Sequence, residues 1–192
     1  MSSLPHLERV FPLLAAAGYE KTSEATGRPP KCGAYNCIAW AAGDPHRWWW
    51  PDSYSYWPRG IQRETTVLCF VKTFRSLGYR ECRDSRKEFA FDKVALYAIH
   101  TSKLEVKPPA SLSSLSDWEP THMARQLRDG TWTSKAGAAE DLTHFTLDAV
   151  ESYIPGLAYG CPVLFMKRFV LVSWIVKLCQ CTHWKLIGSK RI

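Results

Sequence analysis

Residues 121–135 read THMARQLRDGTWTSK, and this stretch decides the fold. Its first half alternates in character, Arg128-Asp129-Gly130 provides a turn, and its second half continues as an extended run. Two alternating runs around an Asp-Gly turn are the strongest short-range indication of a β-hairpin. Because successive strand residues point to opposite faces, we expect His122 and Gln126 on one face and Met123 on the other.

The segments around this hairpin differ before and after it. Apolar residues recur at helical spacing before it, whereas extended segments rich in apolar and β-branched residues dominate afterwards. The segments expected to be helical are residues 6–18, 37–43 and 64–77, with a short helical stretch within 139–150. The segments expected to be strands are residues 93–99, both arms of the hairpin, and 162–167. This order predicts the α+β class, with N-terminal helices packed on an antiparallel sheet.

The positive charge is concentrated in the last part of the chain. The chain has 25 Lys and Arg against 18 Asp and Glu, a net charge of +7. Six basic residues and no acidic residue lie in residues 167–192, so the remainder is close to neutral. We predict a single α+β domain over residues 1–168 and an appended apolar, basic segment over residues 169–192. Nucleic-acid binding is not expected, because no nucleic-acid-binding motif accompanies the charge.

The seven cysteines favour a reducing compartment. Their odd number and the lack of a signal peptide at the start of the chain indicate a cytoplasmic protein without a disulfide framework. No apolar run reaches the roughly 20 residues of a membrane span. Cys179, Cys181 and His183 offer zinc ligands without the second pair that structural zinc needs, so we expect neither a metal nor another cofactor. The oligomeric state stays open.

The heptapeptide YNCIAWA at residues 35–41 follows a polar loop rich in proline and glycine. Cys37 therefore begins an apolar helix that Asn36 or a near neighbour caps. Unpaired N–H groups at a helix N-terminus stabilise a thiolate, which makes Cys37 the candidate nucleophile. His122 follows 85 residues later on a strand and is the candidate general base. His144 is a weaker candidate for that role.

A histidine base is usually oriented by a third group, and an acyl-transfer site needs oxyanion donors. Ser134 and Asp141 are the candidates for the orienting group, although neither stands in a clear match to such enzymes. Asn36 and Gln126 are the candidate oxyanion donors. The competing interpretation is structural, because an unpaired cysteine is among the most often buried residues and a strand histidine is commonly part of a core.

Residues 44–60, DPHRWWWPDSYSYWPRG, form an irregular aromatic loop after the cysteine helix. One interpretation is that the rings cover the core. The other is that they form one wall of a substrate cleft, because aromatic side chains beside a nucleophile stack on ligands. The candidate substrate-binding residues in this loop are Trp48, Trp49, Trp50 and Trp57.

Five strings in this sequence resemble the pattern of a mainly bacterial family described as a domain of unknown function. The strings are YNCIAWA at 35–41, WWWP at 48–51, GY at 78–79, KVALYA at 93–98 and the hairpin through Gly137 with Glu140-Asp141 after it. The resemblance covers roughly residues 10–167 and implies no activity. The excursion at 101–120 is longer than the pattern, and the segment after Arg168 has no counterpart in it.

The order of Cys37 on a helix and His122 on a later strand is similar to that of papain-like hydrolases, including CHAP and NlpC-type amidases. This similarity implies a papain-like fold and a cysteine-dependent amide hydrolase of the peptidase, amidase or deamidase kind, acting on a peptide or amide substrate. The alternative is a non-catalytic binding module, associated with defence or a toxin, that uses the aromatic cleft. The sequence does not identify a protein partner.

Overall fold

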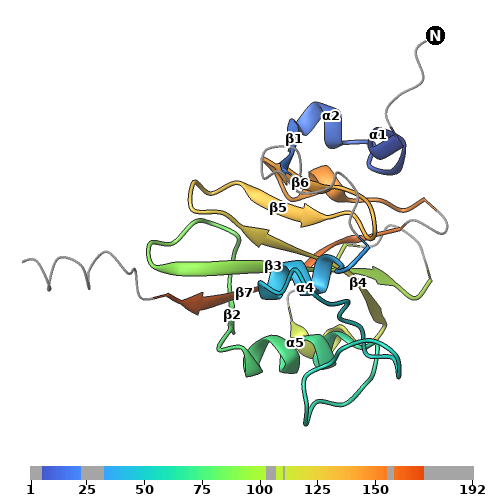
Figure 1. The fold of residues 1–192 in the computed structure, drawn as a ribbon, viewed down its shortest axis with the longest axis vertical. Helices are drawn as coiled ribbons and strands as arrows, with labels where there is room; N and C mark the ends of the chain where they lie inside the picture. Colours follow the sequence, from blue (N-terminus) through green and yellow to red (C-terminus); the bar gives the residue numbers. More distant parts are fainter. Residues whose placement is uncertain (1–5, 23–32, 103–106, 110, 155–157, 171–192) are drawn as a thin grey trace, which may run out of the picture.

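The structure of the protein is a computed structural model that describes residues 6–22, 33–102, 107–109, 111–154 and 158–170. A seven-stranded sheet with the order β1-β6-β5-β4-β3-β7-β2 forms its centre (Figure 1). Every neighbouring pair of strands in this sheet is antiparallel. The fold is therefore of the α+β class, as the sequence predicts.

The elements of the described residues follow one another in a simple order. The strands are β1 (Tyr19–Lys21), β2 (Arg80–Cys82), β3 (Phe91–His100), β4 (Trp118–Gln126), β5 (Trp132–Lys135), β6 (Asp141–His144) and β7 (Cys161–Phe169). The helices are α1 (His6–Val10), α2 (Leu14–Ala17), α4 (Cys37–Ala42) and α5 (Val67–Ser76), with 3-10 turns η1 (Leu112–Ser114) and η2 (Asp148–Val150).

The hairpin at the centre of the sequence is present as β4 and β5, which confirms that prediction. Gln126 pairs with Trp132, and the Leu127 N–H donates to the Thr131 carbonyl at 2.8 Å. Gly130 has a φ of 97°, a conformation that only glycine adopts without strain. The turn chemistry therefore fixes the register that positions every side chain of β4 and β5.

Two expectations about local structure need correction. The helix expected over residues 6–18 is divided into α1 and α2, because Pro12 lies between them and has no N–H to continue a helical ladder. The stretch 139–150 contains the strand β6, and its helical part is only the 3-10 turn η2. The pairing of β6 with both β5 and β1 supplies the hydrogen bonds that favour the extended form.

Each face of the sheet carries its own hydrophobic cluster. Neighbouring residues of β3 divide between them, with Leu96 in the first cluster and Tyr97 in the second. Helices α4 and α5 contribute to the first cluster, and α1 and α2 to the second. In Figure 1, α4 and α5 lie against the β3–β4–β7 part of the sheet, and α1 and α2 lie beside β1 and β6. The candidate nucleophile Cys37 belongs to the first cluster, together with Met123 of β4.

The predicted boundary at residue 168 falls inside β7, one residue before the strand ends, and only residues 169 and 170 of the predicted appended segment are described. The Val170 N–H donates to the Ala90 carbonyl at 2.9 Å, so the described chain is hydrogen-bonded to its end. Within the described ranges, no helix is long and apolar enough to cross a membrane.

Candidate functional site

Asn36 fixes the start of helix α4 and ties it to the aromatic loop. Its Oδ1 accepts the Ala39 N–H at 3.1 Å, which makes it the N-cap of the helix. The same oxygen accepts the Trp49 N–H at 3.3 Å, and its amide Nδ2 donates to the Trp49 carbonyl at 2.7 Å. The side chain predicted as an oxyanion donor is thus hydrogen-bonded within the fold at both of its polar atoms.

Cys37 is the first residue of α4, and its side chain is only 5% exposed. Burial raises the pKa of its thiol to about 11, and this outweighs the lowering effect of backbone N–H groups of Met123, Ile38 and Cys37 itself and of the charge of Lys135. The sequence predicts stabilisation of a thiolate by the helix N-terminus. The structure contains those N–H groups, but desolvation of the sulfur is the larger effect, so the resting group is a neutral thiol.

His122 is fully buried on β4, and its ring is enclosed by aromatic side chains. The Tyr159 ring stacks on it with centroids 4.4 Å apart, and the Tyr97 ring packs edge-on at 5.2 Å. Burial, with a smaller contribution from His144, holds its pKa well below the ordinary value. His122 is therefore neutral at physiological pH.

A chain of hydrogen bonds runs from His122 to the backbone after β6. The Nε2 atom of His122 lies 3.0 Å from Ser134 Oγ, which lies 2.9 Å from His144 Nε2. The Nδ1 atom of His144 lies 2.6 Å from the Thr146 carbonyl oxygen. The register of the sheet explains this alignment, since Ala124, the second residue after His122, pairs with Ser134. The structure thus brings the predicted orienting residue Ser134 to His122.

Asp141, the other predicted orienting residue, lies in a different environment. Its Oδ2 accepts a hydrogen bond from the Tyr35 hydroxyl at 2.7 Å, and its Oδ1 lies 3.9 Å from Lys135 Nζ. Lys135 is completely buried and donates to the Ala139 carbonyl. Asp141 and Lys135 are paired across β5 and β6 and lie toward helix α4, with the Tyr35 ring 5.2 Å from the ammonium group.

Cys37 and His122 reach the same part of β4. The thiol accepts from the backbone N–H of Met123, the residue next to His122. Tyr159, which stacks on His122, has the pKa of its hydroxyl raised by burial and further by the nearby Cys37. No hydrogen bond joins Cys37 to His122 among the residues that the structure describes. The Nδ1 atom of His122 is buried and has no hydrogen-bond partner there.

A close approach of the backbone holds Tyr159 over His122. Gly160 has a φ of 66°, and a Cβ atom built on it would lie 1.9 Å from the Ala98 carbonyl oxygen. The Thr121 hydroxyl donates to the Tyr159 carbonyl at 2.5 Å. Only glycine allows the chain to pass this near to β3, so Gly160 is required for the stacked ring.

The aromatic loop contributes mainly to the core. Trp49 and Trp57 are buried, and their indole N–H groups donate to Asp44 and to the Gln62 carbonyl. The Trp50 ring packs edge-on against Phe70 at 5.6 Å. Of the four predicted tryptophans, Trp48 is the exposed one, at 36%. The loop therefore covers the first cluster, to which Cys37 also belongs.

Gln126 also lies away from the Cys37 region. It is four residues beyond His122, and its amide donates to the carbonyl groups of Ser85 and Gly130 at 2.9 and 3.2 Å. These bonds attach the residues after β2 to the hairpin turn. The side chain predicted as an oxyanion donor therefore holds two loops together.

His144 and Tyr159 are parts of the site that sequence reasoning underestimated or missed. The sequence suggests His144 only as a weaker candidate for the general base. Leu142 pairs with Ser134, and His144 lies two residues later on the same strand. Because alternate strand residues share a face, this spacing indicates that His144 lies near Ser134. Nothing in the local sequence around Tyr159 indicates its stacking on His122, because the contact depends on a close passage between distant segments.

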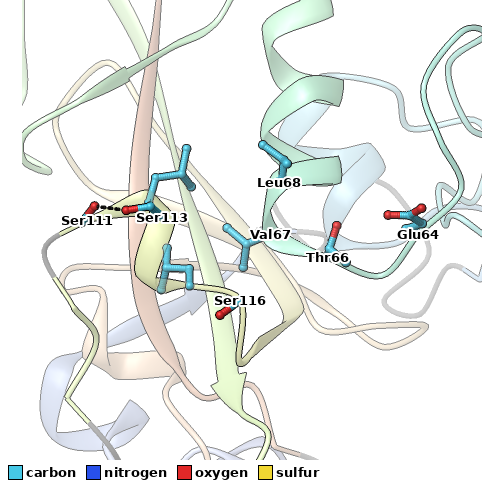
Figure 2. Close-up of a pocket in the computed structure, with 9 residues that line it drawn as sticks. Glu64, Thr66, Val67, Leu68, Ser111, Ser113 and Ser116 are labelled. Carbon is cyan, nitrogen blue, oxygen red and sulfur yellow. Dashed lines mark hydrogen bonds between the residues drawn. The ribbon is translucent and has the colours of Figure 1, made fainter.

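The described part of the chain contains a cavity but no cluster of metal ligands. Its described residues contain no group of three or more His, Cys, Asp or Glu side chains placed to hold a metal ion. The cluster of Cys179, Cys181 and His183 lies outside the described residues. A cavity of about 700 Å³ lies between the start of α5 and the η1 turn, and Figure 2 shows Val67 and Leu68 facing Ser113 and Ser116 across it. None of the predicted site residues lines that cavity.

The chain matches the model of a family described as a domain of unknown function, DUF7689, over residues 20–167. This match covers most of the chain, and the protein belongs to that family. No curated protein and no solved structure matches the chain significantly.

Proposed function

We propose that this member of the DUF7689 family is a papain-like, cysteine-dependent amide hydrolase or transferase with Cys37 as nucleophile and His122 as general base. One observation carries the proposal. The Cys37 thiol is hydrogen-bonded to the N–H of Met123, and the adjacent residue is His122, whose buried Nδ1 has no hydrogen-bond partner. A thiol at a helix N-terminus and a neutral histidine with an unoccupied lone pair, held on the strand next to that helix, are the two groups that nucleophilic catalysis requires.

The resting pair is neutral, and this determines the proposed chemistry. As the sulfur attacks an amide carbonyl, a C–S bond forms and the thiol proton passes to His122. The histidinium then gives that proton to the leaving amine as the C–N bond breaks. Water releases the acyl group from sulfur with His122 again acting as base. The backbone N–H groups of Cys37 and Met123 are the donors available to the oxyanion.

The alternative, a binding module built on the aromatic loop, has weaker support. Trp49 and Trp57 are buried in the first cluster, and their indole N–H groups donate to Asp44 and to the Gln62 carbonyl. The exposed rings of this loop are those of Trp48 and Tyr54.

Acylation with p-nitrophenyl acetate tests the proposal without knowledge of the substrate. We expect a burst of p-nitrophenol and an acetyl thioester at Cys37, found by peptide mass mapping. Cys37→Ser removes the nucleophilic sulfur and should lower the acylation rate by roughly 100-fold or more. The matched control is Cys82→Ala, which removes a half-buried thiol of β2 away from His122 and should leave the burst intact. Acetyl groups spread over the other cysteines, with an unchanged burst in Cys37→Ser, would contradict the proposal.

A further inference from the structure

We infer that His144 is a positioning residue that acts through Ser134 to fix which ring nitrogen of His122 carries the hydrogen. The inference rests on the proposed role of His122 as the base of Cys37. It concerns a residue that does not itself touch the sulfur or the substrate. The argument starts at the far end of the hydrogen-bond chain, where only one arrangement of hydrogens is possible.

The Thr146 carbonyl oxygen can only accept, so the Nδ1 atom of His144, 2.6 Å away, must carry a hydrogen. In a neutral imidazole the other nitrogen is then an acceptor. His144 is neutral, because burial holds its pKa below the ordinary value. Its Nε2 atom therefore accepts the hydroxyl hydrogen of Ser134 at 2.9 Å.

The same logic continues to His122. The Ser134 hydroxyl has given its only hydrogen to His144, so toward His122 it can only accept. The Nε2 atom of His122, 3.0 Å away, must therefore carry the hydrogen. The Nδ1 atom of His122 is left with a lone pair, and it is the buried ring atom that has no hydrogen-bond partner. A backbone carbonyl at Thr146 thus determines the basic nitrogen of His122.

Burial makes this assignment strict. His122 and His144 are 0% exposed and Ser134 is 1% exposed, so bulk water does not reach the hydrogen bonds between these three side chains. The Tyr97 hydroxyl does not compete for the ring nitrogens of His122, since it donates to the Leu147 carbonyl at 2.6 Å. No carboxylate is hydrogen-bonded to either histidine in the described part of the chain. Neutral groups alone therefore set the direction of the hydrogen bonds that join His122, Ser134 and His144.

The tautomers are measurable by ¹⁵N-resolved NMR of the histidine rings in the full chain without substrate. We expect His122 to carry its hydrogen on Nε2 and His144 on Nδ1. His144→Phe keeps the ring volume but removes the acceptor for the Ser134 hydroxyl, which then becomes able to donate to His122 Nε2. His122 should then populate both tautomers. Ser134→Ala should have the same effect, and Ser134→Thr should restore the single tautomer because it keeps the hydroxyl.

The same variants are then acylated with p-nitrophenyl acetate. Losing the preference that one hydrogen bond provides should slow acylation of Cys37 by about fivefold in His144→Phe and Ser134→Ala, with recovery in Ser134→Thr. His100→Gln is the matched control, since His100 is hydrogen-bonded to Ser102 and packs edge-on against Trp118, neither of which is hydrogen-bonded to His122, Ser134 or His144.

Three results would overturn the inference: a hydrogen on His122 Nδ1 in the unmodified protein, an unchanged tautomer in both His144→Phe and Ser134→Ala, or changed tautomers with unchanged acylation. Failure of the proposed function has a different outcome, because Cys37→Ser would then acylate normally while the tautomers still follow Ser134 and His144. If His144→Phe does not fold, the Ser134 pair of variants decides the question alone.

Discussion

Burial opposes ionisation of the Cys37 thiol, and this links its charge to the stability of the fold. Its pKa is about 11 in the folded chain against an ordinary value of 9.0 for a thiol exposed to water. The folded state therefore binds the thiol proton more tightly than the unfolded state does. The stabilisation is complete below pH 9 and is lost as the pH rises through 11. Alkaline conditions unfold the protein in part because they charge this sulfur.

We predict that the free energy of unfolding of the unmodified protein falls by about 2 kcal/mol more between pH 8 and pH 10.5 than that of Cys37→Ser. The reason is that serine does not titrate in this range, whereas every tyrosine titrates in both proteins and cancels in the difference. Urea unfolding at the two pH values measures it. If the free energy of unfolding falls equally in the two proteins, the Cys37 thiol is not desolvated in the folded state.

At the level of single residues, the sequence identifies types of side chain better than their partners. Cys37 and Asn36 are predicted at the start of a helix because capping is a local property. The sequence does not distinguish between Ser134 and Asp141 as the group that orients His122. Only the pairing of β5 with β4 and β6 distinguishes them. The alternation of β5 directs Ser134 toward His122 and Lys135 toward Asp141 on the opposite face.

Helix α4 depends on a single cap, and we predict that removing it has two effects. Asn36→Ala abolishes the hydrogen bond to Ala39 and both bonds to Trp49. The free energy of unfolding should fall by about 2–3 kcal/mol, because buried donors at Ala39 and Trp49 lose their acceptor. The Cys37 burst should also diminish, since the start of the helix positions the sulfur. Urea unfolding and the burst assay measure these effects.

Asn36→Ser is the matched variant, because its hydroxyl oxygen can cap the helix by accepting the Ala39 N–H and it lacks the amide donor to the Trp49 carbonyl. Its loss of stability should be smaller than that of Asn36→Ala. Equal losses in both variants would show that the amide donor to Trp49, and not the cap, is the dominant interaction.

The elements show where local patterns stop being informative. Residues 121–135 form a hairpin as expected, because alternation and turn chemistry agree within one short stretch. The apolar spacing of residues 6–18 predicts one helix. It takes no account of Pro12, whose missing N–H interrupts the helical hydrogen bonds between Phe11 and Leu13. Strand β6 is four residues long, and its extended form depends on β1 and β5, which no window of that length can contain.

At the scale of the whole molecule, the segment beyond β7 carries the excess positive charge. We predict that a chain ending at Val170 still unfolds cooperatively and keeps its circular dichroism spectrum. The reason is that this chain keeps β7 and the hydrogen bond from the Val170 N–H to the Ala90 carbonyl. The same chain should lose salt-sensitive binding to heparin, since the lysines and arginine of residues 171–192 are then absent.

Thermal unfolding and heparin chromatography of the shortened and full chains test this prediction. Failure of the shortened chain to fold would mean that residues 171–192 are integral to the domain. Unchanged retention on heparin would instead place the polyanion-binding surface on the body of the protein.

Strand β7 is the last strand of the described chain, yet it lies between β3 and β2 inside the sheet. During synthesis, β2 and one edge of β3 therefore wait without a neighbour until residues 161–169 have left the ribosome. An apolar β3 with an open edge readily pairs with other chains. A nascent or prematurely terminated chain is thus exposed to aggregation and to quality-control proteases until its final described strand arrives, and helices α1 and α2, although made first, cannot prevent this.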